Sequence, residues 1–284
     1  MDIRFVSADE AVSHISSHSH IHLSSVASVP PGLIRALCRR ADRGAVTDLH
    51  FHHFHSEGPA PYSAPEYEGI FFDQGFFIGP NVRANVNAGY ADYLPVHLGE
   101  TPKLYRSGAI KLEAALVNIS LPDENGMVSL GTSVDCSPAA IECARIVIGV
   151  VNPNVPYSYG ESIPLSEFDY LVQDDEPLVT AHFAEPTELE VQIGKNCASL
   201  IDDGDCLQMG IGALPNALAS QLAGHKDLGL HAEMFADGLL RLIKAGVING
   251  RRKKIDTGKV VSSFLLGSQD VYSFIDHNPE VNMR

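Results

Sequence analysis

Short runs of β-branched and apolar residues alternate along this chain with stretches of helical character, and this alternation limits the possible folds most. Residues 115–121 (ALVNISL) and 145–151 (RIVIGVV) have the composition of buried strands. Between them, residues 137–144 (SPAAIECA) are typical of a helix, with Ser137 as the expected N-cap and Pro138 in the first position. A strand, a helix and a second strand in this order predict a βαβ unit with parallel strands.

The C-terminal part of the chain repeats the alternation. Its expected elements are a helix at about 190–201, a strand at 206–211, a helix from Pro215 to near Gly224, a strand at 228–233 and a helix N-capped by Asp237 and closed by Gly246. These elements form two successive βα units. We therefore predict an α/β fold with two open domains, each built on a mostly parallel sheet.

A change in composition separates the two halves. Residues 152–190 are rich in proline and acidic residues, which is typical of an irregular crossing segment, with one short strand expected at FDYLVQ. We place the domain boundary near residue 188, which gives domains at 1–188 and 189–284.

Charge and composition exclude several functional classes. The formal net charge of −15 disfavours nucleic acid and anionic membranes, because both require basic surfaces. No stretch reaches the roughly 18 apolar residues of a membrane helix, and the acidic N-terminus does not resemble a secretory signal, so a cytoplasmic protein is expected. The five cysteines form no CxxC pair, which favours reduced thiols over disulfides or a zinc knuckle.

Glu233 stands out because Leu230, Met234 and Phe235 surround it with apolar side chains at the end of an expected strand. Ligands of parallel α/β sheets bind outside the carboxyl ends of the strands. Partial burial should raise the pKa of this carboxyl group, while nearby helix N-termini keep part of it ionised. Such a carboxylate can attack an acyl carbon. Alternatively, the acid simply favours the positive end of the following helix.

The segment GIGALPNAL begins at Gly210, at the end of the preceding strand, and should face the same crevice as Glu233. Its glycines would let the backbone approach an anionic ligand at a helix N-terminus, although they could also serve turn geometry alone. A dinucleotide site is a further alternative, because Glu233 follows Gly212 by 21 residues, near the offset of about 20 in the Rossmann fingerprint. Pro215 replaces the third glycine of that fingerprint and counts against NAD.

Histidines are dense in DLHFHHFHSEG, which contains His50, His52, His53 and His55. On a strand, alternation places the first two on one face and the last two on the other. Two histidines on a face lack the third ligand of a catalytic zinc site. We therefore predict no metal site there, nor in the earlier histidine-rich HISSHSHIHL.

Four segments, in order along the chain, carry a family resemblance. They are FIGPNVRANVNAGYADYLPVHLGETPKLYRSGAIKLEAALVNISLPDENGMVSLGTSVD, LQMGIGALPNAL, LGLHAEMFADGLLRLIKAGVING and GSQDVYSFIDHNPEVNMR. Through them the chain resembles the acetyl-CoA hydrolase/transferase family of class I CoA-transferases, most closely the 4-hydroxybutyrate CoA-transferase type. The resemblance covers the chain from about residue 77 to its last residue.

The resemblance implies a role for each matching residue. Glu233 corresponds to the catalytic glutamate, and the CoA-binding loop corresponds to Gly210, Ile211, Gly212, Ala213 and Leu214. It implies ping-pong transfer of CoA from an acyl-CoA to a small carboxylate through a glutamyl-CoA thioester, with no permanently bound cofactor. It also implies a homodimer or larger assembly. An acyl-CoA hydrolase and a non-catalytic or partner-dependent CoA-binding subunit remain alternatives.

Two departures from the family pattern matter. The family usually has a glycine-rich turn near its N-terminus, where this chain has HLSSVASVPPGL with Ser24, Ser25 and Ser28. The family also continues past NPEVNMR into a second glycine-rich segment, so we expect the second domain to be incomplete.

Overall fold

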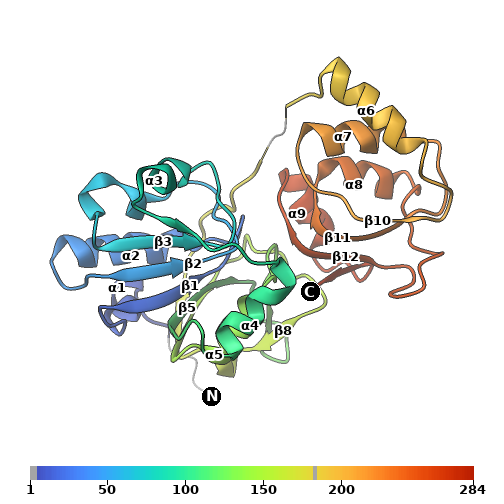
Figure 1. The fold of residues 1–284 in the computed structure, drawn as a ribbon. Coiled ribbons are helices and arrows are strands. Elements are labelled where there is room, and N and C mark those ends of the chain that lie inside the picture. Colours follow the sequence, from blue (N-terminus) through green and yellow to red (C-terminus); the bar gives the residue numbers. More distant parts are fainter. Residues whose placement is uncertain (1–4, 182–183) are drawn as a thin grey trace. The chain divides into compact units, whose positions relative to one another are not determined.

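A computed structural model describes residues 5–181 and 184–284. The chain forms two compact units: one contains residues 1–155 and 162–179, and the other contains residues 156–161 and 180–284. Both units are α/β, as the alternation predicted (Figure 1). The boundary predicted at residue 188 lies at the first residue of helix α6 in the second unit.

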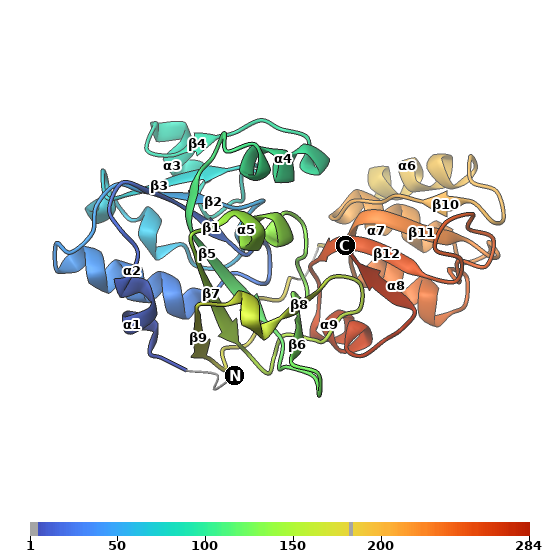
Figure 2. The ribbon, with the colours of Figure 1, turned by 90° about the horizontal axis from the view of Figure 1, so that it is seen from below.

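The first unit is built on a seven-stranded sheet in the order β4-β3-β2-β1-β5-β7-β9, and each of its strand pairs is parallel (Figure 2). Its strands are β1 (Ser19–Leu23), β2 (Leu49–His52), β3 (Phe71–Gly75), β4 (Asp92–Tyr93), β5 (Leu112–Ile119), β7 (Ile146–Val151) and β9 (Tyr170–Gln173). A separate antiparallel pair joins β6 (Met127–Ser129) to β8 (Ser162–Pro164). The prediction of a mostly parallel sheet is therefore confirmed.

The helices of the first unit are short, apart from α2. They are α1 (Ala8–Ser13), α2 (Pro31–Asp42), α3 (Arg83–Ala88), α4 (Thr101–Arg106) and α5 (Ser137–Cys143), with 3₁₀ turns η1 (Pro61–Ser63), η2 (Pro65–Tyr67), η3 (Leu98–Glu100) and η4 (Leu165–Glu167). Every residue of β7 is buried, as expected for a strand covered on both faces. The apolar side chains of α1 and α2 join those of the central strands in one core.

The second unit is a four-stranded parallel sheet in the order β10-β11-β12-β13. Its strands are β10 (Cys206–Leu207), β11 (Gly229–Phe235), β12 (Val260–Leu265) and β13 (Val281–Met283), and its helices are α6 (Glu188–Ala198), α7 (Ala213–Gln221), α8 (Asp237–Lys244) and α9 (Gln269–Ile275). A helix follows each of the first three strands. The two predicted βα units are therefore present.

Several predicted boundaries were wrong in detail. The strand expected at 206–211 contains only Cys206 and Leu207, because the chain leaves the ladder with β11 after Leu207. The helix expected from Pro215 starts at Ala213. Ser137 is the first residue of α5 and not its N-cap, a position that Cys136 takes.

The end of β11 also differs from the prediction. The strand continues through Glu233 to Phe235, because its ladder with β12 extends to the pair Phe235 and Leu265. The N-cap of α8 is Ala236, while Asp237 is the first helical residue and its carboxylate accepts hydrogen bonds from Ser268 instead. Within the described residues, no helix combines the length and apolar character required to cross a bilayer.

Candidate active site

Glu233 lies on β11 in the middle of the second sheet. Its side chain is half-buried and belongs to the same strand face as exposed His231, whereas Ala232 and Met234 on the other face are buried. The ladder with β12 fixes its backbone, and its carbonyl oxygen accepts a hydrogen bond of 3.0 Å from the hydroxyl of Ser262. A rigid strand therefore carries this carboxylate, rather than a loop.

The strand order places the glycine loop next to the strand of Glu233. Strand β10 is parallel to β11, with Leu207 opposite Leu230, and the chain then runs through residues 208–212 into α7. Because both strands point the same way, the loop and Glu233 lie toward the carboxyl edge of the same sheet. The two predicted parts of the site are thus carried by adjacent strands.

Gly212 has a backbone conformation that favours glycine. Its φ of +110° and ψ of −176° lie in a region that other residues rarely adopt, and it forms the N-cap of α7. Gly210 is exposed, and a Cβ at either glycine would meet no atom within 4 Å. Ile211 and Ala213 are half-buried, and Leu214 is exposed. The loop backbone is therefore open to close approach by a ligand.

Sequence reasoning missed the contact between Asp237 and Ser268. The Asp237 carboxylate accepts a hydrogen bond of 3.0 Å from the Ser268 N–H and a second from the Ser268 hydroxyl. This carboxylate ties the segment after β11 to the segment after β12. It therefore holds the chain in place only four positions beyond Glu233.

Buried Lys253 supports the other end of β11. Its Nζ donates hydrogen bonds to the carbonyl oxygens of Leu230 (3.0 Å) and Lys259 (2.7 Å). Burial lowers the pKa of this ammonium group, although nearby Asp256 acts in the opposite direction. No pattern in the sequence pointed to this contact.

A cavity of about 770 Å³ in the second unit is lined mainly by small and apolar residues of α7, α8 and the chain around the start of α6, with Asn216, Asp237 and Arg241 among its polar residues. Neither Glu233 nor residues 210–214 line it. We therefore define the candidate site by the sheet edge, where ligands of parallel sheets bind, and not by this cavity.

In the first unit, the serine-rich turn that follows β1 is held by buried hydroxyl groups. Ser24 Oγ accepts a hydrogen bond of 3.2 Å from the Asn118 N–H, and Ser25 Oγ accepts one of 2.8 Å from the Phe54 N–H. Ser28 Oγ lies 2.7 Å from Thr132 Oγ1. These serines fix the turn against three separate segments.

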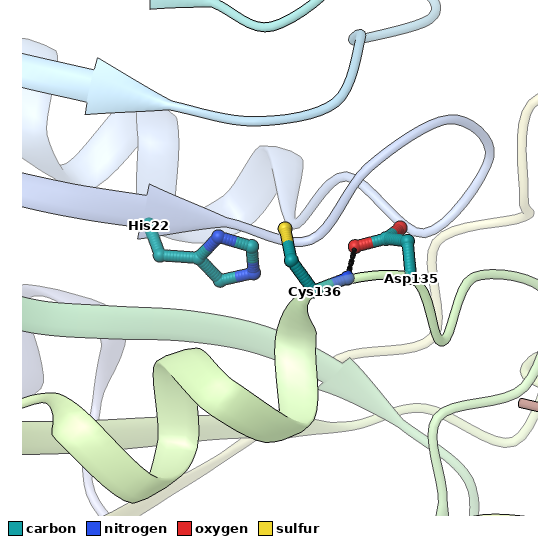
Figure 3. A group of neighbouring side chains, drawn as sticks. All are labelled: His22, Asp135 and Cys136. Carbon is teal, nitrogen blue, oxygen red and sulfur yellow. Dashed lines mark hydrogen bonds between the residues drawn. The ribbon is translucent and has the colours of Figure 1, made fainter. Parts of the chain in front are cut away.

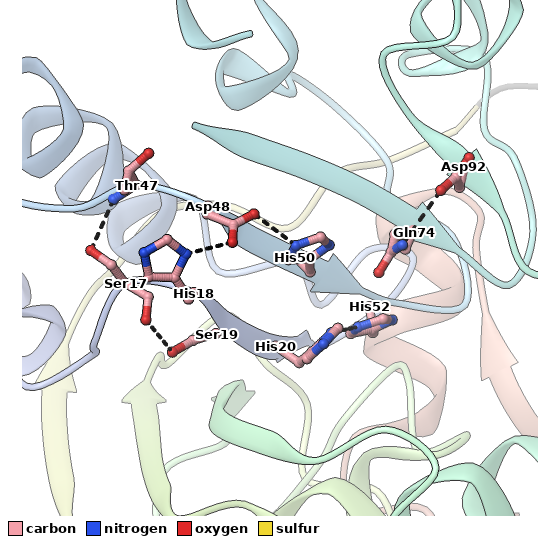
Figure 4. Close-up of polar contacts among 10 residues, drawn as sticks. All are labelled: Ser17, His18, Ser19, His20, Thr47, Asp48, His50, His52, Gln74 and Asp92. Carbon is pink, nitrogen blue, oxygen red and sulfur yellow. Dashed lines mark hydrogen bonds and ion pairs between the residues drawn. The ribbon is translucent and has the colours of Figure 1, made fainter. Parts of the chain in front are cut away.

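Three histidines of the first unit, His20, His50 and His52, contact one another across β1 and β2 (Figure 4). His20 Nδ1 lies 2.7 Å from His52 Nε2, and the rings of His20 and His50 are 4.9 Å apart. His53 instead contacts Asp73, at 3.0 Å. His50 and His52 therefore share one face, as predicted, whereas His53 and His55 lie beyond the last residue of β2. Burial, followed by the charge of His20, lowers the pKa of His52 to about 3.

Residues 2–181 match the sequence profile of the acetyl-CoA hydrolase/transferase N-terminal domain. The chain belongs to the acetyl-CoA hydrolase/transferase family. Within this family, it is 38% identical over 279 residues to the 4-hydroxybutyrate coenzyme A transferase of Clostridium kluyveri, covering 98% of this chain and 65% of that protein. This result confirms the family resemblance seen in the sequence.

Two further comparisons agree with the family assignment. A succinyl-CoA:acetate/propanoyl-CoA:succinate CoA transferase of Fasciola hepatica is 38% identical, with 97% of this chain and 58% of that protein covered. The crystal structure of a 4-hydroxybutyrate CoA-transferase from Porphyromonas gingivalis superposes with a TM-score of 0.87 at 36% identity, covering 99% of this chain and 67% of that chain. The chain spans less than two thirds of the length of both curated relatives.

Proposed function

We propose that the protein is an acyl-CoA:carboxylate CoA-transferase in which Glu233 is the nucleophile. The observation that carries the proposal is the position of Glu233: a half-buried carboxylate, on a rigid strand, beside the strand that leads into the open glycine loop. Family membership and the names of the relatives, all CoA transferases, support the same chemistry.

The proposed reaction begins at the thioester carbonyl of the acyl-CoA. The Glu233 carboxylate attacks this carbon, the C–S bond breaks, and an acyl-glutamyl anhydride and the CoA thiolate form. The thiolate then attacks the glutamyl carbonyl and releases the first carboxylate, leaving a glutamyl-CoA thioester. A second carboxylate runs the two steps in reverse and leaves as its CoA ester. No net proton is consumed.

The glycine loop supplies the binding half of the proposal. Residues 210–214 lead into α7, whose free N–H groups can hold an anionic part of CoA. Backbone N–H groups of this loop are also candidates to stabilise the oxyanions of the tetrahedral intermediates. Side chains are small or absent at Gly210, Gly212 and Ala213, so backbone and ligand can meet directly.

The names of the relatives indicate the substrate class. Most are short aliphatic acids, namely 4-hydroxybutyrate, succinate with acetate or propanoyl-CoA, and butyrate with acetyl-CoA, while one relative is named for succinyl-CoA with cyclohexane-1-carboxylate. We propose short aliphatic carboxylates for this chain as well. We also propose that copies of the chain associate, as the family resemblance implies, which the mass of the native particle in solution tests.

Chemical trapping tests the role of Glu233. The chain is incubated with acetyl-CoA or butyryl-CoA and treated with borohydride or hydroxylamine, which convert a glutamyl thioester into an alcohol or a hydroxamate. Peptide mass mapping should locate the change at Glu233. Glu233→Gln should abolish trapping and transfer, whereas Glu280→Gln, an exposed acid in the same unit, should leave both unchanged. Transfer that persists in Glu233→Gln would show that the assignment is wrong.

Hydrolysis is the second candidate, because the matching family includes hydrolases by description. Water that attacks either acyl-enzyme intermediate releases free CoA without an acceptor. Release of CoA from acetyl-CoA should depend on added carboxylate for a transferase and be independent of it for a hydrolase. Saturable CoA binding without either reaction would instead favour a CoA-binding subunit.

A further inference from the structure

Three side chains with metal-binding atoms meet in the first unit, and the proposed reaction uses none of them. His22 lies near the end of β1, while Asp135 and Cys136 directly precede α5. One ligand atom from each residue lies within 4.8 Å of the other two. Figure 3 shows His22 and Asp135 on either side of Cys136. Within the described residues, this is the one group of three or more His, Cys, Asp or Glu with such geometry.

We propose that His22, Asp135 and Cys136 bind one Zn²⁺ ion, with a water molecule as the fourth ligand, although the sequence alone predicted no metal site in the histidine-rich segment that contains His22. Imidazole nitrogen, thiolate sulfur and carboxylate oxygen are the three donor types that zinc uses in proteins. The thiolate and the imidazole disfavour Mg²⁺ and Ca²⁺, which bind through oxygen. On binding, the Cys136 thiol loses its proton to solvent and a Zn–S bond forms. The ion would join the end of β1 to the start of α5.

The spacing of the donors is compatible with zinc after a small adjustment. Zinc bonds of about 2.0–2.3 Å place tetrahedral ligand atoms roughly 3.3–3.7 Å apart. The donors lie within 4.8 Å of one another, so they must approach by about 1 Å. The side chains of His22 and Cys136 are fully buried, and half-buried Asp135 provides the side from which an ion can enter.

The groups around the three donors fit an outer shell. His22 Nδ1 lies 3.2 Å from the Tyr105 hydroxyl, and His22 Nε2 lies 3.1 Å from the Ser137 hydroxyl. Whichever nitrogen binds the ion gives up its hydroxyl partner, while the other keeps one to orient the ring. Asp135 also accepts a hydrogen bond of 2.5 Å from the Ser133 hydroxyl.

The charge of the cluster also favours a divalent cation. In the described part of the chain, Asp135 forms no ion pair with lysine or arginine. With the Cys136 thiolate formed, two negative charges lie close together with restricted access to water. Such charges are costly to bury unless a cation balances them. A single Zn²⁺ ion supplies the matching charge.

Cobalt substitution tests the proposal with a spectroscopic readout. The full chain is stripped with a chelator and titrated with Co²⁺, which should give a thiolate-to-cobalt charge-transfer band at one ion per chain, and Zn²⁺ should displace it. Cys136→Ser should remove the band, while Cys143→Ser, which changes a half-buried thiol in α5 outside the cluster, should retain it. Absence of the band in the unaltered chain, or its survival in Cys136→Ser, would overturn the site.

A second measurement needs no variant and covers the case in which Cys136→Ser fails to fold. A thiol reagent reaches buried Cys136 only when the surrounding structure opens locally. Equimolar Zn²⁺ should slow alkylation of Cys136 by about tenfold or more, in line with the effects of losing metal-site contacts. Alkylation of Cys197, an exposed thiol, should not change. Equal slowing at both thiols, or at neither, contradicts the proposal, and neither result depends on CoA transfer.

Discussion

Replacement of Gly212 by alanine tests how much one backbone conformation contributes to the free energy of unfolding. A Cβ at this position would meet no atom within 4 Å, so steric contact adds nothing. The φ of +110° and ψ of −176° are themselves unfavourable for alanine, by about 1–3 kcal/mol. Alanine also lowers the conformational entropy of the unfolded chain, and this offsets about 0.4–1 kcal/mol of the loss in stability. We expect a net loss of about 1–2 kcal/mol in the free energy of unfolding of the second unit.

Gly210→Ala is the matched control for this prediction. Gly210 also has no atom within 4 Å of a new Cβ, but its φ is not positive, so the strain is absent. We expect its effect on the free energy of unfolding to stay within about 0.5 kcal/mol of zero, or to be slightly stabilising.

Urea unfolding followed by circular dichroism provides the measurement, since the chain contains no tryptophan to report by fluorescence. With an m-value of about 2 kcal/mol/M, Gly212→Ala should lower the midpoint by about 0.5–1 M and Gly210→Ala should barely change it. Hydrogen exchange of the α7 amides should accelerate in Gly212→Ala alone. Equal midpoints for the two variants would refute the argument from backbone conformation.

Three further predictions concern stability. Glu113→Gln should cost about 0.5–1 kcal/mol at pH 7, because exposed Arg145 lowers the pKa of Glu113. In urea titrations the difference should shrink as the pH falls below 4.5, the ordinary pKa of the group, and vanish only below the lowered pKa of the folded chain. His52 stays neutral in the folded chain down to about pH 3, whereas the unfolded chain takes up the proton near 6.5. His52 alone should therefore contribute a fall of up to about 1.4 kcal/mol per pH unit in the free energy of unfolding below 6.5, and His52→Gln should reduce the observed slope by that contribution; a slope unchanged in the variant would contradict it. Asp237→Asn should cost about 1–2 kcal/mol, because it removes the charge of the acceptor for both hydrogen bonds from Ser268. Ser268→Ala should cost less, because the backbone N–H bond remains, and identical urea midpoints for Asp237→Asn and the unaltered chain would argue against the contact.

Local patterns predicted the elements of this chain, and their ends depended on partners far away in sequence. The helix and strand of 137–151 could be predicted because the apolar composition and Pro138 agree within a few residues, although the cap assigned to Ser137 was wrong. The shared face of His50 and His52 follows directly from strand geometry, because both lie on β2. By contrast, the N-cap of α8 was predicted at the wrong residue, because the Asp237 carboxylate accepts hydrogen bonds from Ser268, which lies 31 positions further along the chain. A local sequence pattern cannot show that a distant residue binds this carboxylate in place of the N–H groups of its own helix.

The candidate site divides in the same way. Glu233 and the glycine loop could be found because polar or small residues interrupt apolar strands at the edge where parallel sheets bind ligands. The role of Lys253 could not be predicted, because the carbonyl groups that it binds, those of Leu230 and Lys259, belong to β11 and to the segment before β12. The cluster of His22 with Cys136 was equally hidden, since more than a hundred residues separate them.

The serine hydroxyls after β1 have a consequence for how this turn tolerates change. The turn carries Val26 with a φ of +55°, a conformation that β-branched residues seldom adopt. Its conformation is therefore imposed by hydrogen bonds to the segments around Phe54, Asn118 and Thr132 and not by the preferences of its own residues. A substitution in any of those neighbouring segments can relax Val26 without touching it. Variation at this turn should accordingly be tolerated only in combination with compensating changes in those segments.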